Sequence, residues 1–249
     1  MHWEDEGFVI GARDHGETAV ILEVMTRHHG RHLGLVHGGR SRKVRPILQA
    51  GNGLSLGWRA RTDDQLGHFA PEPASLRSAR LIGSSLALYG LGTLALHLRH
   101  LPERDPHPGL YEAAAFLLDR LDEPGLAPAL FVRFELMLLA ELGFGLDLGA
   151  CAATGRTGDL AFVSPKSGRA VSEEAGAPYR DRLLRLPAFL AGEAAATARE
   201  DDLEAGFRLT AFFLDAHVWA PRGQGAPDER ARFVHEAARR ERSENAGGL

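Results

Sequence analysis

The period of the apolar positions changes once along the chain, near residue 75. Before that point the apolar residues come in short, β-branched or alternating runs that are separated by glycine or polar turns. Such runs are typical of strands. The pattern predicts five short strands, at 8–10, 18–24, 31–36, 54–60 and 66–69. Five strands within so few residues favour a small Greek-key barrel such as an OB-fold, and the pattern leaves an SH3-like barrel open.

After Leu76 the apolar positions follow a helical period. Pro71 and Pro73 precede the change, and we expect them to stop the fifth strand because proline has no N–H for a ladder. Helices are predicted at 81–98, 110–121, 130–142, 182–190, 202–218 and 228–240. Residues 151–179 are rich in glycine and serine with little periodicity, and we interpret them as an insertion.

The fold class that follows is α+β with two domains. Residues 1–75 are predicted to form a five-stranded OB-fold barrel that binds nucleic acid. Residues 76–249 are predicted to form an all-α domain with a loop-rich insertion at 150–179 and a flexible tail at 243–249.

Charge is unevenly distributed along an otherwise ordinary composition. The chain has 249 residues, of which 44% are hydrophobic and 25% charged, with a net charge of −4. Residues 1–80 carry 11 Lys or Arg and 9 Asp or Glu, whereas residues 81–249 carry 18 and 24. The positive charge is therefore local, which favours a binding face over general attraction to anions.

The positive charge concentrates in an interval that contains no acidic residue. No Asp or Glu occurs from Val24 to Thr62, a stretch with eight Arg or Lys and four His. Within it, four cations follow a Gly-Gly pair and precede Pro46: Arg40, Arg42, Lys43 and Arg45. We predict an exposed, mobile hairpin tip that carries these charges to a long anionic partner.

The cations of this interval are the candidate contacts to nucleic acid. Arg40, Arg42, Lys43 and Arg45 are predicted to bind phosphate. Secondary contacts are predicted from four further residues, Arg27, Arg31, His37 and Arg59. Trp58 and Phe69 are aromatic residues that could stack on bases, although their alternation with polar neighbours equally favours burial.

Motifs for catalysis and metal binding are missing from the sequence. No GxxxxGK[ST], HExxH or GxSxG segment occurs, and the pairs Asp201-Asp202 and Glu173-Glu174 are typical of solvated carboxylates. His28, His29 and His32 lie close together, but neighbouring arginines disfavour a metal there, and phosphate binding by partly protonated histidines is the better interpretation. We therefore expect neither an enzyme nor a bound cofactor or metal.

Cysteine usage and hydropathy predict the compartment. The single cysteine, Cys151, excludes an internal disulfide framework and favours a reducing environment. The first residues lack a signal-peptide pattern, and no apolar run approaches 18 residues. We expect a cytoplasmic, nucleoid-associated protein without a membrane partner.

Several short motifs follow one another along the chain. They are Gly16-Glu17-Thr18, Thr26-Arg27-His28-His29-Gly30-Arg31, Gly38-Gly39-Arg40-Ser41-Arg42, Leu48-Gln49-Ala50-Gly51-Asn52, and the run from Phe134-Glu135-Leu136 through Leu142-Gly143-Phe144 and Leu146-Asp147-Leu148 to Cys151. In this order they resemble the bacterial RecO family of DNA repair proteins. Each motif is modest by itself, but the collinear set covers most of the chain.

The resemblance implies a recombination mediator and not an enzyme. It implies an OB-fold that binds single- and double-stranded DNA, anneals complementary strands, and helps load RecA onto strands coated by single-stranded DNA-binding protein. The implied partners are RecR, possibly RecF, and the acidic tail of single-stranded DNA-binding protein. For that tail the helical domain offers five candidate cations, Arg133, Arg180, Arg182, Arg185 and Arg208.

One departure from the family pattern concerns the insertion. Many members hold zinc there with four cysteines, whereas this chain keeps only Cys151 and has no histidine between Cys151 and Tyr179. Zinc is not expected, because a structural site needs about four ligands. The insertion would be a degenerate zinc-finger-like module with Cys151 as a small buried residue.

Two other functions remain open at this point. An RNA-binding or ribosome-associated OB-fold protein would show the same barrel and the same basic loop. A protein–protein adaptor would use mainly its helical domain, and the basic loop would then be a solvated turn without salt-dependent binding to nucleic acid.

Overall fold

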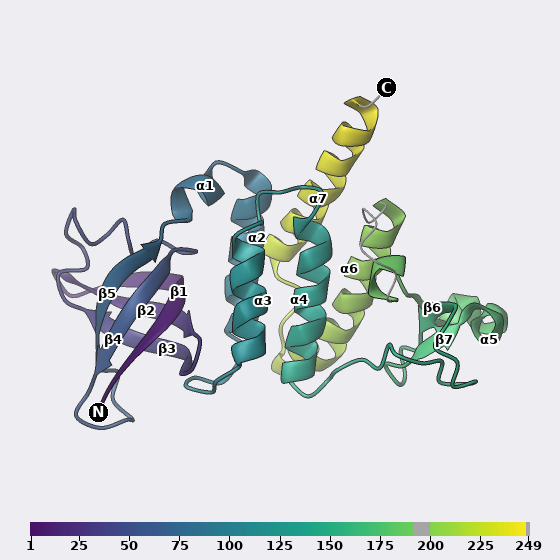
Figure 1. Ribbon diagram of the computed structural model, residues 1–249, viewed down its shortest axis with the longest axis horizontal. Coiled ribbons are helices and arrows are strands. Elements are labelled where there is room, and N and C mark those ends of the chain that lie inside the picture. Colours follow the sequence, from purple (N-terminus) through teal and green to yellow (C-terminus); the bar gives the residue numbers. More distant parts are fainter. Residues whose placement is uncertain (192–199, 248–249) are drawn as a thin grey trace. The chain divides into compact units, whose positions relative to one another are not determined.

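The computed structural model describes residues 1–191 and 200–247 (Figure 1). The chain forms two compact units, Met1–Asp122 and Glu123–Leu249, which are described separately below. No helix among the described residues is long and apolar enough to cross a membrane.

The first unit begins with a closed five-stranded barrel. Its strands are β1 (His2–His15), β2 (Ala19–Thr26), β3 (Gly30–Val36), β4 (Gly53–Arg59) and β5 (His68–Ser75). They close in the order β1-β2-β3-β5-β4, with β4 paired back onto β1. All neighbours are antiparallel except β3 and β5, which pair in parallel. This Greek-key order is that of an OB-fold, and the predicted fold class is confirmed.

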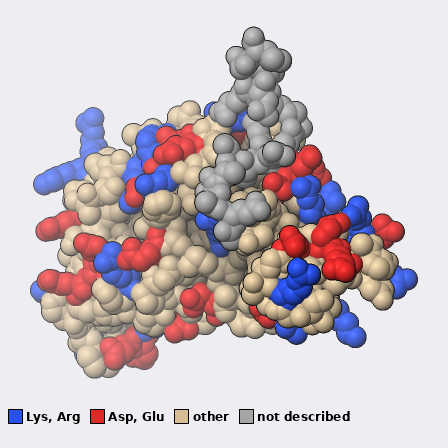
Figure 2. Space-filling view, turned by 45° about the vertical axis from the view of Figure 1, so that its right-hand side comes forward, with Lys and Arg blue, Asp and Glu red and all other residues tan. Residues whose placement is uncertain are grey.

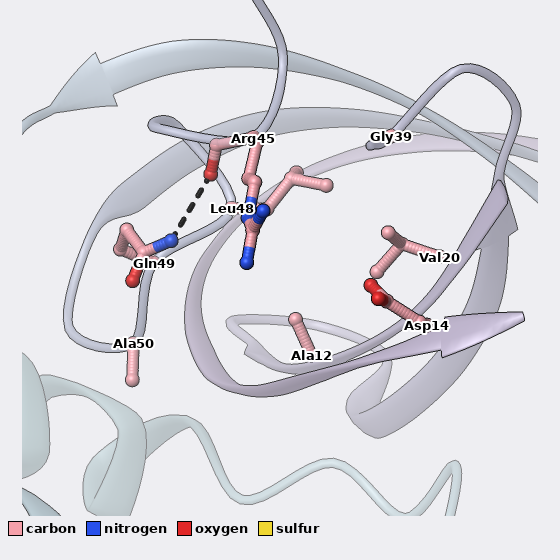
Figure 3. A pocket seen from close by; sticks show the side chains of 8 residues that line it. All are labelled: Ala12, Asp14, Val20, Gly39, Arg45, Leu48, Gln49 and Ala50. Atoms are coloured by element: carbon pink, nitrogen blue, oxygen red, sulfur yellow. Dashed lines mark hydrogen bonds between the residues drawn. The ribbon is translucent and has the colours of Figure 1, made fainter. Parts of the chain in front are cut away.

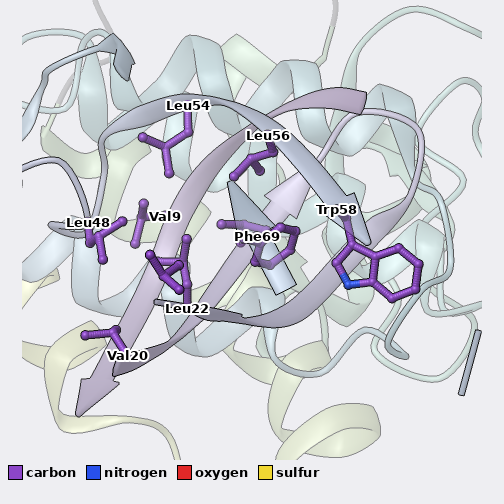
Figure 4. Close-up of a cluster of buried hydrophobic side chains, with 10 residues drawn as sticks. Val9, Val20, Leu22, Leu48, Leu54, Leu56, Trp58 and Phe69 are labelled. Carbon is purple, nitrogen blue, oxygen red and sulfur yellow. The ribbon is translucent and has the colours of Figure 1, made fainter. Parts of the chain in front are cut away.

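Alternation along the strands fills the interior of the barrel (Figure 4). On β4, Leu54, Leu56 and Trp58 are buried while Ser55 and Arg59 face outward. Trp58 is 1% exposed, and its indole N–H donates to the carbonyl of Leu66 at 3.1 Å. Phe69 lies in the same cluster. Neither ring is available for base stacking, so the burial alternative for both is correct.

The prolines near residue 72 do not end the last strand as expected. Pro71 lies opposite Leu56 and Pro73 opposite Leu54 within the β4–β5 ladder. The prolines are tolerated because β5 pairs with β3 only at its first residue, His68, so most of its other edge needs no N–H donor.

Three helices complete the first unit: α1 (Ser78–Ile82), α2 (Ser85–Leu98) and α3 (Pro108–Leu118). The helix predicted at 81–98 is interrupted at Gly83 and Ser84, because the Ser84 hydroxyl caps a new helix by accepting from Ala87 N. Phe8 of β1 stacks on Tyr111 of α3 with centroids 5.5 Å apart. The first compact unit therefore extends to Asp122, whereas the sequence places a domain boundary after residue 75.

The second unit is built on α4 (Ala127–Glu141), α6 (Glu200–Leu214) and α7 (Asp228–Gly247), with a π-helical turn at Asp215–Trp219. Glu135 of α4 is fully buried and accepts two hydrogen bonds from Arg230 of α7, at 2.7 and 2.9 Å. The helix α7 continues past Ser243, so the expected tail is helical as far as Gly247.

Two strands of the insertion, β6 (Leu160–Val163) and β7 (Ala170–Ser172), form a small sheet with β8 (Leu184–Arg185), which lies beyond the predicted end of the insertion. The short helix α5 (Glu173–Gly176) follows β7. Cys151 is buried as expected, and its Sγ accepts from Ser172 N at 3.2 Å.

The helix predicted at 182–190 is wrong. Leu184 pairs with Val163 in the sheet, and 3-10 segments cover Ala177–Arg182 and Ala188–Leu190. Leu186 is buried without being part of a helix. Pro187 follows it and blocks a continuous helix through this segment.

Candidate nucleic-acid interface

The acid-free cluster of cations lies on residues 37–52, which we call the β3–β4 connection. The strands that it joins are not neighbours in the barrel, because β3 pairs with β2 and β5 while β4 pairs with β1 and β5. The predicted hairpin tip is therefore wrong. The segment crosses from one side of the barrel to the other, as the Greek-key order requires.

The connection is anchored to the barrel by its own apolar residues. Leu48 is 2% exposed within the barrel core, and Val44 and Ile47 pack partly against it. Asn52 is fully buried, and its side-chain amide donates to the carbonyls of Pro46 at 3.1 Å and of Ile47 at 3.2 Å. The cations are thus carried by a folded segment.

A close approach requires glycine at position 39. A Cβ atom there would lie 2.8 Å from the Cβ of Val20 and 3.2 Å from a methyl group of Leu48. The backbone of the connection therefore lies directly on β2, and Arg40 N donates to the carbonyl of Thr18 at 3.1 Å. This contact sets the position of the residues that follow.

Arg42, Lys43 and Arg45 are exposed and form no ion pair or side-chain hydrogen bond with any residue that the structure describes. The side chains of Arg42 and Lys43 extend into solvent from a folded backbone, and the Arg45 side chain lines a pocket beneath the connection. Figure 2 shows Lys and Arg side chains standing out from the surface at its upper left edge. These three residues are the predicted contacts whose charge is available to an anion.

Arg40 has a different position from its three neighbours. Its guanidinium donates to the carbonyls of Gly16 at 3.1 Å and Glu17 at 3.0 Å, and its Nε lies 3.4 Å from Asp14 Oδ2. These bonds fasten the connection to the β1–β2 turn, so Arg40 has less free charge than the sequence predicted.

Arg27 and Arg31 are paired with carboxylates from outside the acid-free interval. Arg31 Nη1 lies 2.8 Å from Glu23, and its Nε donates to the carbonyl of Leu101 at 3.2 Å. Arg27 lies 2.8 Å from Glu112 of α3. The interval contains no acidic residue in the sequence, but in the structure a neighbouring strand and a helix place carboxylates beside its arginines.

The two remaining predicted contacts lie outside the connection or at its first residue. His37 stacks on His68 with centroids 4.7 Å apart and is exposed. Arg59, at the end of β4, is exposed without an ion pair within the described part of the chain. The structure therefore leaves Arg59 available and commits the His37 ring to a stacked pair.

The other histidines of the interval have partners within the barrel. His28 and His29 each place Nδ1 within 3.0 Å of the buried Asp5 carboxylate. His32 is 2% exposed among aromatic rings, and burial lowers its pKa to about 4, so it is neutral at pH 7. Across residues 1–191 and 200–247, no cluster of three or more His, Cys, Asp or Glu could hold a metal ion.

A pocket that the sequence did not indicate lies beneath the connection (Figure 3). It has a volume of about 310 Å³ and is lined by Ala12, Asp14, Val20, Gly39, Arg45, Leu48, Gln49 and Ala50. Asp14 belongs to β1, far from the connection in sequence, so only the barrel register brings it to Arg45. No local pattern could have predicted that Asp14 and Arg45 line the same pocket.

The five candidate arginines of the second unit are mostly engaged. Four of them pair with nearby groups: Arg133 with the Phe189 carbonyl, Arg180 with Glu173, Arg185 with Asp202 and Arg208 with Glu204. Arg182 is exposed and has no such partner within residues 1–191 and 200–247.

A closed five-stranded barrel of Greek-key order, followed by a helical unit, places the chain in the class of OB-fold proteins with an added helical domain. The family descriptions "Recombination protein O N terminal" and "Recombination protein O C terminal" match residues 1–75 and 85–224. The chain belongs to the RecO family of DNA repair proteins.

Individual relatives agree with this assignment. The DNA repair protein RecO of Methylorubrum populi is 62% identical over 239 residues, covering 94% of this chain and 97% of the relative. That of Methylobacterium nodulans is 62% identical over 238 residues with the same coverage. RecO of Brucella abortus is 53% identical over 239 residues, covering 96% of this chain and 97% of the relative.

Proposed function

We propose that this RecO-family protein is a recombination mediator that binds DNA through the β3–β4 connection. Arg42 and Lys43 contact phosphates, Arg45 contacts the same strand from the inner side of the connection, Arg59 contributes further positive charge, and Arg40 mainly fixes the connection. The protein binds single- and double-stranded DNA and anneals complementary strands. No covalent chemistry is needed for this role, and the proposal assigns none.

The observation that carries the proposal is the difference in pairing among the cations. Three neighbouring side chains are charged, exposed and without an acidic partner among the described residues, on a backbone held by Leu48, Gly39 and Asn52. A charge that is already paired gains little from a phosphate, because it must first give up its carboxylate. An unpaired charge on a fixed backbone has no such cost.

Electrostatic binding without base-pair reading suits strand annealing. Two strands repel one another through their phosphates, and cations that bind the backbone reduce this repulsion and release condensed counterions. Because the contacts are to phosphate, they do not depend on sequence. A mediator must accept any strand, and phosphate contacts supply this part of the affinity whatever the base sequence.

The partners follow from the family and complete the proposal. We propose that the protein acts in the cytoplasm, at the nucleoid, with RecR, and with RecF as a further partner, to load RecA onto strands coated by single-stranded DNA-binding protein. The acidic tail of that protein needs a cation on the second unit. Arg182 is the candidate that the structure leaves unpaired within its described residues.

The test is an annealing assay with two variants of equal charge change. Arg42→Glu/Lys43→Glu reverses two charges of the connection, and Lys166→Glu/Arg182→Glu reverses two exposed, unpaired charges of the second unit. Annealing of bare complementary oligonucleotides is measured at about 100 mM salt. We expect the first variant to slow annealing by roughly tenfold or more and the second to leave it within about twofold.

Equal effects of the two variants would contradict the site, because only net charge would then matter. A competition among single-stranded DNA, double-stranded DNA and structured RNA is run in parallel. Preferential binding to structured RNA would favour an RNA-binding role. If the protein bound none of the three nucleic acids at any salt concentration, a protein–protein adaptor would be favoured.

A further inference from the structure

The pocket beneath the β3–β4 connection combines an aliphatic floor with three polar side chains. Ala12, Val20 and Leu48 supply apolar surface, and Asp14, Arg45 and Gln49 supply charge and hydrogen-bonding groups. Its volume of about 310 Å³ lies at the small end of the usual range for sites that bind small molecules or single chemical groups.

The polar groups of the pocket are of two kinds. In Figure 3 the Arg45 side chain reaches into the pocket from the connection, and Asp14 reaches in from β1. The Arg45 guanidinium has no partner among the described residues and offers donors only. One Asp14 oxygen, Oδ2, lies 3.4 Å from Arg40 Nε, and the other has no hydrogen bond within the described chain.

Gln49 is held so that its amide faces the same space. Its Nε2 donates to the carbonyl of Arg45 at 3.2 Å, which leaves its oxygen as an acceptor. The pocket therefore presents donors from Arg45 and acceptors from Asp14 and Gln49, together with aliphatic groups. A flat heterocycle with both kinds of edge satisfies this arrangement, whereas a free phosphate would be repelled by Asp14.

We propose that this pocket takes up one unstacked nucleobase of a bound single strand, and guanine before the others. The inference rests on the proposed DNA-binding role, because Arg42 and Lys43, three and two residues before Arg45, would hold the adjoining phosphates. Apolar side chains contact the faces of the base and the polar groups read its edge, as in other sites for extruded bases.

Guanine matches the polar groups better than the other bases do. It presents two neighbouring donors, N1–H and the N2 amino group, which a carboxylate such as Asp14 accepts. It also presents two neighbouring acceptors, O6 and N7, to which arginine is the usual bidentate partner. Thymine has no exocyclic amino group, so a thymine strand measures phosphate binding with the least contribution from the pocket.

The experiment compares oligo-dT with the same strand carrying one central guanine. Wild-type protein is expected to bind the guanine strand at least about fivefold more tightly. Ala12→Leu places a larger apolar side chain in the pocket without changing charge, and it should abolish this preference while affinity for oligo-dT is kept. Ala70→Leu, at an exposed alanine of β5 outside the pocket, is the matched control and should keep the preference.

A second variant and a spectroscopic signal keep the test valid if Ala12→Leu does not fold. Asp14→Asn replaces one of the two carboxylate acceptors by an NH2 donor and removes the negative charge at an exposed position, so it should lower the guanine preference without lowering affinity for oligo-dT. A fluorescent guanine analogue at the central position should brighten on binding to wild-type protein, because it leaves the base stack, and should not brighten with Asp14→Asn.

The outcomes separate this inference from the proposed function. Equal affinity of wild-type protein for both strands, or a guanine preference that survives Ala12→Leu and Asp14→Asn, overturns the base pocket. If Arg42→Glu/Lys43→Glu leaves oligo-dT affinity unchanged, the phosphate site itself is overturned. Loss of oligo-dT affinity in that variant together with no base preference in wild type rejects the pocket alone.

Discussion

Two groups of cations in one acid-free stretch of sequence have opposite surroundings in the structure. Arg27 and Arg31, on either side of the β2–β3 turn, are paired with Glu112 and Glu23. Arg42 and Lys43, in the β3–β4 connection, have no acidic partner within the described residues. Absence of acidic residues along the chain therefore does not establish free charge, because packing in three dimensions decides which cations are neutralised.

The largest expected effect concerns the anchoring of the connection. Asn52→Ala removes donors to the Pro46 and Ile47 carbonyls and the acceptor of Ser78 N, all around a fully buried side chain. We expect a loss of about 3 kcal/mol in barrel stability, together with weaker DNA binding. Hydrogen exchange of amides in β2 and β4 reports the barrel separately from the second unit.

The matched change is Gln49→Ala, which removes an exposed side chain that also bonds to the connection. It should alter barrel stability by less than about 0.5 kcal/mol. Equal effects of the two substitutions would show that Asn52 does not anchor the connection.

The second effect concerns His32, which the sequence groups with the phosphate-binding histidines. Burial lowers its pKa to about 4, below the ordinary value near 6.5, so the unfolded chain binds the proton more tightly than the folded barrel. Stability should therefore fall as the pH is lowered from about 6.5 towards 4, by about 2 kcal/mol between pH 7.5 and pH 5.

His32→Phe keeps a ring among Trp3, Trp58 and Phe69 but cannot be protonated. In hydrogen exchange across this pH range, the variant should lose most of the pH dependence of barrel opening. The same slope in both proteins would place the titrating group elsewhere.

A third effect distinguishes a paired arginine from a free one. Arg31→Ala removes an ion pair to Glu23 and a bond to the Leu101 carbonyl, at a side chain that is only 13% exposed. We expect a loss of about 1 kcal/mol in barrel stability. Arg42→Ala, at an exposed and unpaired position, should stay within about 0.5 kcal/mol of wild type in the same exchange measurement. A reversed order would contradict the assignment of paired and free charges.

The smallest expected effect comes from a substitution that converts a paired cation into a free one. Glu112→Gln removes the carboxylate that lies 2.8 Å from Arg27 and leaves Glu6 at 4.0 Å. Affinity for single-stranded DNA should rise by about twofold, because an exposed pair is weak and its release changes little. Glu72→Gln makes the same charge change at an exposed, unpaired residue of β5, and fluorescence anisotropy should show a smaller rise for it.

Much of the fold could be predicted from local pattern. Alternation of buried and exposed residues identified β4, and helical spacing identified α4 and α6, because one face of each element packs on a core. The sequence pattern was misleading where contacts with a neighbouring strand decided the secondary structure. The prolines of β5 are tolerated because most of one edge of that strand is unpaired, and Leu184 joins a sheet that its spacing did not indicate.

The candidate site could be predicted only in part. The sequence located Arg42, Lys43 and Arg45, since their charge and their flanking glycines are local features. It could not locate Asp14 opposite Arg45, or the carboxylates that neutralise Arg27 and Arg31, because these contacts depend on strand register and on helices distant in the chain.

The most direct test of free against paired charge is the salt dependence of single-stranded DNA binding. Each phosphate contact adds about −0.7 to the slope of log K against log salt concentration, and the slope does not depend on modest differences in stability. The slopes of wild type, Arg42→Gln/Lys43→Gln and Arg27→Gln/Arg31→Gln are compared at a temperature where all three are folded. We predict that the slope becomes shallower by about 1.4 for the first variant and stays unchanged for the second. Equal flattening in both variants, or flattening only in the second, would contradict the account.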